Sequence, residues 1–270
     1  MSAITLTVDG RGIATVVIDH PPINLMTTDV FVELAKLTNE LAIDTGVRVV
    51  VLRSANPEWF IAHFDVEAIL GFPTDTAAPS EPPGFHRMCE TLRTMPKPTI
   101  AVIEGRVGGG GNEVAMSCDM RFATQQAVFN QPEVALGIIP GGTGTVRLPR
   151  LVGRGRALEI ILGCDDIDAA TAEQWGMINR VLRATEIGPY VDRLAGRIAG
   201  FPRDAVAAAK ASIVRAEQEF GDDLLAEATA FSSLLGNADS RDAMTSFLNH
   251  GGQTPAGERR LGDLAGEISG

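Results

Sequence analysis

The pattern of apolar and polar residues predicts strands and helices from the start of the chain. Two apolar-rich runs, residues 4–8 and 13–18, flank the turn dipeptide Asp9-Gly10, which predicts a β-hairpin. A helical repeat of apolar residues follows the candidate N-cap residues Thr27 and Thr28, and it consists of Val30, Leu34, Leu37 and Leu41. Gly46 ends this helix before residues 47–52, an apolar run typical of a buried strand.

The middle of the chain alternates loops with short helical segments. Residues 71–84 are rich in Pro, Thr, Ala and Ser, which predicts a flexible surface loop. Helices are expected next at residues 85–95, closed by Pro96 and Pro98, and later at residues 156–162 and 169–175, with Gly176 as a C-terminal stop.

From about residue 187 the pattern is helical throughout. Three apolar stripes predict helices, and they are Ile187, Val191, Leu194 and Ile198; Val206, Ala209 and Ile213; and Leu224, Ala228, Phe231 and Leu235. Such stripes form core or subunit contacts. Residues 251–270 are polar, and Leu261, Leu264 and Ile268 have the spacing of a marginal helix that we expect to order on a neighbouring subunit.

A glycine run in the stretch 97–148 carries the first chemical signal. Residues 108–111 are four glycines between an apolar strand at 99–103 and a helical segment that begins near Glu113. Glycines let a ligand approach the backbone closely, and the N–H groups at a helix start can hold a negatively charged oxygen. The run lacks the Gly-Lys-Ser/Thr ending of a P-loop and the third glycine of a dinucleotide fingerprint. Glu113 would also repel a phosphate, so the pattern favours a carbonyl oxygen whose charge develops during reaction.

A second acid sharpens this interpretation. Glu133 lies in the constrained segment 129–133, apart in sequence from Glu113. Two carboxyl groups presented by separate rigid turns can divide acid and base work, because different burial pushes their pKa values apart. The alternative from spacing alone is that each glutamate is a helix cap or a solvated charge.

Several ordered motifs together resemble the enoyl-CoA hydratase/isomerase (crotonase) superfamily, over most of the chain. The resemblance rests on a fixed order of segments: Trp59 to Glu67, Lys97 to Gly105, Gly108 to Glu113, Ala115 to Asp119, Phe129 to Glu133, Gly137 to Gly142, Leu148 to Gly153 and Ala169 to Val181. It implies an α/β fold, a crotonase-like spiral of repeated ββα units with a C-terminal helical region. On this basis residues 1–200 are expected to form the ββα core with the CoA-thioester site, and residues 201–270 the helical region.

The resemblance also implies roles for individual residues. The backbone N–H groups of Phe64 and Gly110 are expected to form the oxyanion hole, and Glu113 and Glu133 to be the catalytic acid and base. Further expected substrate contacts are Ala62, His63, Gly109 and Gly141. Family hydratases add water across the double bond of a trans-2-enoyl-CoA. The alternatives are isomerisation of the double bond, which needs one proton shuttle, and acyl-CoA binding without turnover.

His63 departs from the family pattern, which has glycine at this position, directly before the proposed donor Phe64. The backbone there must therefore be compatible with a Cβ atom. His63 could contact the substrate or titrate near neutral pH. The alternative is a loop side chain turned to solvent or packed on a neighbour. Phe64 could narrow the acyl pocket or serve in packing alone.

Composition narrows the choice of partners. A net charge of −11 over 270 residues argues against nucleic acid, whereas a CoA ester would need only local cations, with Arg53, Arg87, Lys97 and Arg106 as candidates. The four histidines and three cysteines show no metal-ligand spacing, so we expect no metal and reduced thiols. The N-terminal residues lack a secretory pattern, and no run approaches a membrane span. These features favour a cytoplasmic protein. The resemblance implies a homotrimer or homohexamer in which CoA is only part of the substrate.

Overall fold

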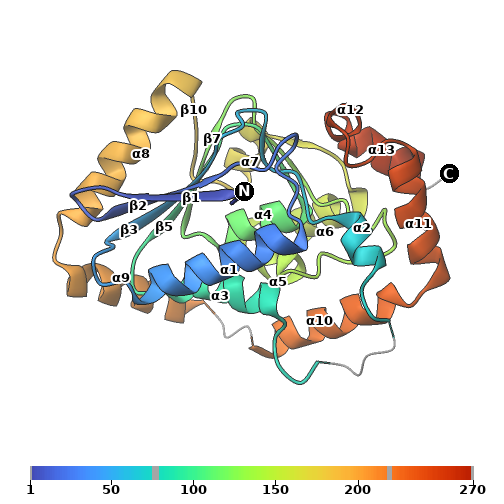
Figure 1. Ribbon diagram of the computed structural model, residues 1–270, viewed down its shortest axis with the longest axis horizontal. Helices are drawn as coiled ribbons and strands as arrows, with labels where there is room; N and C mark the ends of the chain where they lie inside the picture. Colours follow the sequence, from blue (N-terminus) through green and yellow to red (C-terminus); the bar gives the residue numbers. More distant parts are fainter. Residues whose placement is uncertain (1, 75–78, 218–220, 269–270) are drawn as a thin grey trace.

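The computed structural model describes residues 2–74, 79–217 and 221–268, whose strands form two sheets (Figure 1). The larger sheet has the order β1-β2-β3-β5-β7-β10, and the smaller has the order β4-β6-β8-β9. The bounds are β1 Ile4–Val8, β2 Ile13–Ile18, β3 Val49–Ser54, β4 Trp59–Ile61, β5 Thr99–Ile103, β6 Arg106–Gly108, β7 Met120–Thr124, β8 Val128–Asn130, β9 Ile167–Asp168 and β10 Arg180–Leu182.

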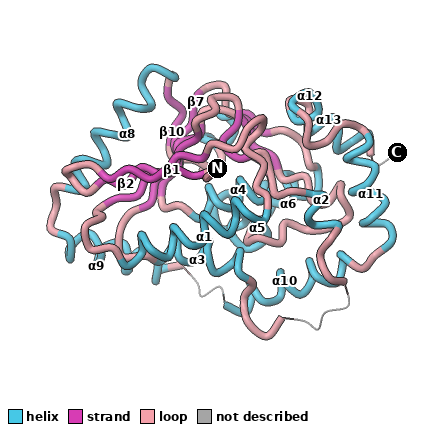
Figure 2. The backbone as a smooth tube through the Cα atoms, in the orientation of Figure 1, coloured by secondary structure: helices cyan, strands magenta, loops and turns pink. Residues whose placement is uncertain are grey.

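Three successive turns of strand, strand and helix build the centre of the molecule. Each turn sends its first strand (β3, β5, β7) to the larger sheet and its second strand (β4, β6, β8) to the smaller sheet, and neighbouring turns pair in parallel. The helices that complete the turns are α2 Val66–Leu70, α4 Gly109–Ser117 and α5 Gly144–Val152. The expected spiral of ββα units is therefore confirmed, and Figure 2 shows its strands stacked beside the helices.

The N-terminal predictions agree with the structure. Strands β1 and β2 pair antiparallel, and α1 Thr28–Ile43 begins after Thr27, whose side chain accepts the Val30 N–H. Val30, Leu34 and Leu41 are buried, while Leu37 is half-buried. The strand expected at residues 47–52 begins two residues later, at Val49.

The remaining helices lie close to their predicted positions. Helices expected at 85–95, 156–162 and 169–175 are present, and Gly176 follows α7 with a φ of +81°. Residues 75–78 of the predicted flexible loop lie outside the described residues. The further helices are α3 Gly84–Thr94, α6 Arg154–Gly163, α7 Ala169–Gln174, α8 Ala184–Ala199, α9 Arg203–Ala216, α10 Gly221–Leu235, α11 Ala238–Asn249, α12 Pro255–Glu258 and α13 Leu261–Glu267.

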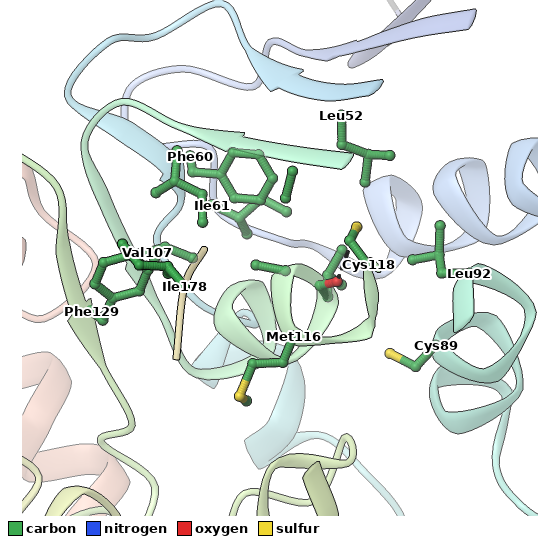
Figure 3. Close-up of a cluster of buried hydrophobic side chains, with 14 of the residues drawn as sticks. Leu52, Phe60, Ile61, Cys89, Leu92, Val107, Met116, Cys118, Phe129 and Ile178 are labelled. Atoms are coloured by element: carbon green, nitrogen blue, oxygen red, sulfur yellow. Dashed lines mark hydrogen bonds between the residues drawn. The ribbon is translucent and has the colours of Figure 1, made fainter. Parts of the chain in front are cut away.

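Helix α4 runs through the core, and every one of its residues is buried. Figure 3 shows Met116 and Cys118 at its C-terminal end, with Phe60, Ile61, Val107 and Phe129 from the smaller sheet nearby. A Cβ atom on Gly111 would lie 2.4 Å from the Ile61 carbonyl oxygen, so only glycine allows α4 to approach β4 this closely. The same glycine run therefore serves packing as well as chemistry.

The C-terminal helices differ in how well this chain covers them. The stripes on α8 and α10 are largely buried, but on α9 only Lys210 is buried and the Ile213 side chain is 70% exposed. Residues 251–268 pack on the chain's own core, because Leu261 and Leu264 join a buried cluster with Leu136, Ile138 and Phe247. The expectation that this segment orders on a neighbouring subunit is wrong. The division of the chain at residue 200 stays a prediction.

Candidate active site

The glycine run forms the N-terminus of α4. This helix begins at Gly109, four residues before the expected start near Glu113, and Gly109 has a φ of +45°. Gly110 therefore lies in the first turn, where a backbone N–H has no acceptor within the helix. The helix start directs that N–H outward, as an oxyanion donor requires.

The second expected donor, Phe64, is held by a short bridge to Met26. The Met26 N–H donates to the His63 carbonyl at 2.9 Å, and the Asp65 N–H donates to the Met26 carbonyl at 3.0 Å. Because a trans peptide points its N–H and C=O in opposite directions, the Phe64 N–H points away from Met26. A Cβ atom on Gly110 would lie 3.6 Å from the Phe64 nitrogen, so the two donors lie side by side.

Glu113 is buried and bound by backbone. Its Oε1 accepts the N–H groups of Gly142 at 2.9 Å and Gly144 at 2.7 Å. Burial raises the pKa of Glu113 well above its ordinary value, and the nearby carboxylates Glu133 and Glu227 raise it further. Glu113 therefore holds a proton far more readily than an exposed glutamate.

Glu133 is also buried, but amide side chains bind it. Gln131 Nε2 donates to Glu133 Oε2 at 3.1 Å, and Asn112 Nδ2 donates to Gln131 Oε1 at 2.8 Å. Burial raises the pKa of Glu133 to about 7, while the hydrogen bond to its own backbone, the charge of His63 and the Gln131 bond act in the opposite direction. A Cβ atom on Gly109 would lie 2.8 Å from Glu133 Oε1, which places this carboxyl group beside the start of α4.

The two carboxyl groups influence each other's protonation. Ionising Glu133 raises the pKa of Glu113, so both groups resist being charged together. Two carboxyl groups that resist being charged together can share one proton and act as one acid and one base.

A small cavity of about 30 Å³ adjoins both donor residues. Its polar wall contains His63, Phe64, Gly110 and Glu133. Its apolar wall comes from α2, the 132–138 turn and α11, and consists of Val66, Ile69, Pro132, Leu136, Ile138 and Phe247. The lining combines backbone N–H groups, one acid and apolar side chains, and the volume is enough for about one water molecule.

His63 is not turned to solvent but is packed on its neighbours, with its ring 5.7 Å from that of Phe247. It is 4% exposed, its Nδ1 lies 2.8 Å from the Phe64 carbonyl oxygen, and its Nε2 lies 3.1 Å from Oε1 of Glu258 in α12. Burial alone would lower the pKa of His63, but the charge and hydrogen bond of Glu258 and the Phe64 carbonyl together raise it to about 8. The surroundings of His63 therefore favour its charged form, one residue from the Phe64 N–H.

Sequence reasoning missed a buried acid on α10. Glu227 accepts the Thr143 N–H at 2.6 Å, the Thr145 N–H at 2.8 Å and His86 Nε2 at 3.1 Å. It thereby holds the start of α5, next to the glycines that bind Glu113. No signal in the sequence pairs Glu227 with residue 143, whereas Gln131 and Asn112 at least lie within motifs that the analysis singled out.

The other expected substrate contacts are distributed unevenly. Gly109 lies beside Glu133, and Ala62 is buried one residue before His63. A Cβ atom on Gly141 would lie 2.3 Å from the ring of Phe231, so Gly141 packs on α10 and does not line the cavity. The roles of all three residues in binding substrate stay predictions.

Three of the four candidate cations have partners in the structure, and one of them is Arg87, which donates to the Pro82 carbonyl at 2.6 Å. Lys97 is buried, and its Nζ donates to the Leu41 and Asp44 carbonyl groups, each at 2.6 Å. Arg106 forms an ion pair with Asp166 at 2.7 Å. Within the described residues, no cluster of His, Cys, Asp and Glu has the arrangement of a metal site. No helix in the described ranges is both long and apolar enough to span a bilayer.

Comparison with known proteins identifies the family. The profile of the enoyl-CoA hydratase/isomerase family matches residues 9–254. The short-chain-enoyl-CoA hydratase of Clostridium acetobutylicum is 34% identical, with 92% of this chain and 95% of that protein covered. The crotonyl-CoA hydratase of Syntrophomonas wolfei is 34% identical, with 87% and 91% covered.

Solved structures agree with the sequence relatives. A candidate enoyl-CoA hydratase from Streptomyces avermitilis superposes with a TM-score of 0.90 at 37% identity, covering 99% of this chain and 98% of the other. The enoyl-CoA hydratase of Mycobacterium avium subsp. paratuberculosis gives a TM-score of 0.81 at 26% identity, covering 97% and 98%. The fold is therefore the crotonase fold, and the chain belongs to the enoyl-CoA hydratase/isomerase family.

Proposed function

We propose that this protein is an enoyl-CoA hydratase that adds water across the double bond of a short trans-2-enoyl-CoA. The observation that carries the proposal is the pair of buried carboxyl groups, Glu113 and Glu133, beside two adjacent backbone donors at Phe64 and Gly110. The names of the relatives from Clostridium acetobutylicum and Syntrophomonas wolfei support the same reaction and a short acyl chain.

The mechanism follows from where charge develops. The thioester oxygen accepts the N–H groups of Phe64 and Gly110, which stabilise the negative charge that forms there as water adds to the β-carbon. One preorganised donor of this kind contributes about 3 kcal/mol to lowering the barrier. The ionised glutamate takes a proton from the water, and the protonated glutamate gives its proton to the α-carbon. The product is a 3-hydroxyacyl-CoA, and the two carboxyl groups have exchanged protonation states.

Isomerisation of the double bond is the second candidate, and one observation favours it. Glu133 lines the cavity with both donors, whereas Glu113 does not. A single carboxyl group at that place is enough to move a proton between two carbons of the acyl chain. Binding without turnover is the third candidate, and the paired buried acids argue against it, because a binder gains nothing from two costly desolvated carboxyl groups.

The test is hydration of crotonyl-CoA by the wild-type protein and by Glu113→Gln and Glu133→Gln. Loss of the conjugated thioester absorbance follows the reaction, and chromatography identifies the product. We expect 3-hydroxybutyryl-CoA from the wild type and a loss of about 10²- to 10⁴-fold in each variant. Glu67→Gln, an exposed glutamate on α2, is the matched control and should retain full activity.

The outcomes separate the three candidates. If Glu113→Gln keeps its activity and only Glu133→Gln loses it, with a shifted double bond as product, the protein is an isomerase. If the wild type binds butyryl-CoA but converts no enoyl-CoA of any chain length, both enzymatic proposals fail.

The remaining expectations are part of the same proposal. CoA enters as part of the substrate, no separate cofactor takes part, and the protein acts in the cytoplasm. The apolar stripe of α9, which this chain leaves largely uncovered with Ile213 70% exposed, supports assembly into homotrimers or homohexamers. Light scattering on the purified protein tests this, and a monomer at working concentration would contradict it.

A further inference from the structure

Building on the proposed hydratase function, we propose that His63 is a positioning residue of the oxyanion hole. In this proposal Glu258 holds the His63 ring as an imidazolium cation, and the ring fixes the backbone of the donor residue Phe64. The same positive charge helps Glu133 to ionise. The family glycine at this position can do none of this.

The hydrogen-bond partners of the ring require two protons. The Phe64 carbonyl oxygen, 2.8 Å from Nδ1, can only accept, so Nδ1 carries a proton. The Glu258 carboxylate, 3.1 Å from Nε2, also accepts, and it accepts the Gln253 N–H at 2.7 Å as well. An ionised Glu258 between these two donors therefore keeps a proton on Nε2.

The ring completes a set of bonds around Phe64. The peptide before Phe64 is fixed by the Met26 N–H, which donates to the His63 carbonyl. The peptide after Phe64 is fixed by the Asp65 N–H and by His63 Nδ1. Both peptide planes that meet at the donor are therefore held, and removing Nδ1 leaves the second plane with one bond fewer and an unpaired carbonyl.

The C-terminal segment is built to hold this arrangement. Gln253 Oε1 accepts the Val66 N–H at 2.5 Å, and Gln253 Nε2 donates to Asp65 Oδ1 at 3.1 Å. Glu258 follows on α12, so one short stretch binds three successive parts of the donor loop. The loop geometry thus depends on residues almost 200 positions later in the chain.

The charged groups around His63 shift its pKa, and His63 shifts theirs in return. Glu258 faces it from α12 and Glu133 from the 131–138 turn, and both charges raise the pKa of His63. In return the His63 charge lowers the pKa values of Glu133 and Glu258, and Arg106 of β6 also lowers that of Glu258. The ring of Phe247 packs edge-on against the imidazole at 5.7 Å and excludes water from it.

Three variants separate position from charge. His63→Asn keeps an N–H donor near the place of Nδ1 but removes the charge, and His63→Gln removes both. Glu258→Gln leaves the ring in place without its counter-charge. Glu267→Gln, an exposed glutamate on α13, is the matched control.

The kinetic result expected is a loss in kcat with little change in KM. We expect about a 10-fold loss for His63→Asn and about a 100-fold loss for His63→Gln, in line with partial and full disturbance of one oxyanion donor. In both variants the limb of the pH–rate profile that reports ionisation of Glu133 should move to higher pH, because the positive charge of the His63 ring no longer lowers the pKa of Glu133. Wild-type kcat and an unmoved pH limb in all three variants, with only a lower Tm, would overturn the proposal.

Two measurements do not depend on turnover. The protein has four histidines, so nitrogen NMR can follow each ring. We expect His63 to be doubly protonated at pH 7 in the wild type and neutral in Glu258→Gln. The infrared band of the thioester carbonyl in bound butyryl-CoA should shift less in His63→Gln than in the wild type.

These measurements distinguish the two ways of failing. If crotonyl-CoA is not hydrated but the NMR and infrared results are as expected, the proposed function falls and the positioning role stands. A neutral His63 ring at pH 7 in the wild type, or an identical infrared shift in His63→Gln, refutes the positioning role whatever the enzyme's activity.

Discussion

The surroundings of Glu113 and Glu133 differ, although both residues are buried in one site. Glu113 is bound by two backbone N–H groups of the glycine turn at 142–144, with the acid Glu227 close behind that turn. Glu133 is bound by the Gln131 side chain and lies near the cation of the His63–Glu258 pair. Glu113 thus has backbone donors with Glu227 behind them, and Glu133 has an amide donor with the hydrogen-bonded His63–Glu258 pair nearby.

These different surroundings explain how Glu113 and Glu133 can have different pKa values although both are buried. Burial and the charge of Glu227 raise the pKa of both, whereas two backbone N–H groups lower that of Glu113 and His63 lowers that of Glu133. The ββα core supplies both carboxyl groups. Helices α10 and α12 supply Glu227 and Glu258, so the C-terminal region contributes to the electrostatics of this site as well as to its packing.

The largest effect is expected from Gly142→Ala, which disturbs the turn that holds Glu113. The new Cβ would lie 2.3 Å from Glu113 Oε2 and 2.6 Å from the Phe85 ring, so the carboxyl group must move. We expect kcat/KM for crotonyl-CoA to fall about 10³-fold, or about 4 kcal/mol in the barrier. Steady-state kinetics on the folded variant, checked by circular dichroism, measure this.

Gly155→Ala provides the control for that substitution. Gly155 lies in α6, and a Cβ atom there would have no heavy atom within 4 Å. This variant should keep full activity and gain a few tenths of a kcal/mol in stability. A Gly142→Ala protein with wild-type kcat/KM would show that Glu113 is not held by this turn during reaction.

The next effect in size is expected from Glu227→Gln, which removes the negative neighbour of Glu113. An amide cannot accept all the N–H groups that the carboxylate accepts at the start of α5, so stability should fall by about 2 to 3 kcal/mol. The pKa of Glu113 should also fall, which moves its limb of the pH–rate profile to lower pH. Urea denaturation and the pH dependence of kcat measure the two effects.

An exposed acid on the same helix is the reference for Glu227. Asp222→Asn also removes one negative charge from α10, but at the surface. It should change neither stability nor the pH profile measurably. If Glu227→Gln behaved like Asp222→Asn, the charge of Glu227 would not be what raises the pKa of Glu113.

A smaller effect is expected in the pH dependence of stability, on the Glu133 side. The pKa of His63 rises from its usual 6.5 to about 8 in the folded protein, so its contribution is complete below pH 6.5 and is lost as the pH rises through 8. The difference corresponds to about 2 kcal/mol. Urea denaturation at pH 6 and pH 9 should show a fall in stability in the wild type, to which the raised pKa values of Glu113 and Glu133 also contribute, and the fall should be smaller in His63→Asn. Equal slopes for both proteins would mean that His63 is neutral.

Much of the fold and the two neighbouring carboxyl groups were predictable from the sequence, because both depend on local patterns. The catalytic roles of these groups stay predictions. The β1–β2 hairpin, α1 and the motifs around Glu113 and Glu133 consist of residues close together in the chain. Glu227 and Glu258 reach their partners His86 and His63 across 141 and 195 positions, and no periodicity connects them. The end of the chain looked too polar to fold on its own, but Leu264 is fully buried in a cluster that only the tertiary structure assembles.

The smallest effect on catalysis is expected from Gln131→Met, which removes the amide that binds Glu133. The loss is one neutral hydrogen bond to the carboxyl group, worth about 1 kcal/mol, and it leaves the Asn112 amide without its acceptor. Because the His63 charge still favours ionised Glu133, kcat/KM should fall only about 5-fold, far less than in Gly142→Ala. Stability should fall by about 1 to 3 kcal/mol for the unpaired Asn112 group. A loss in kcat/KM as large as that of Gly142→Ala would mean that Gln131 orients Glu133 more strongly than the His63–Glu258 pair does. Hydrogen bonds, and not charge, would then account for the difference between the pKa values of Glu113 and Glu133.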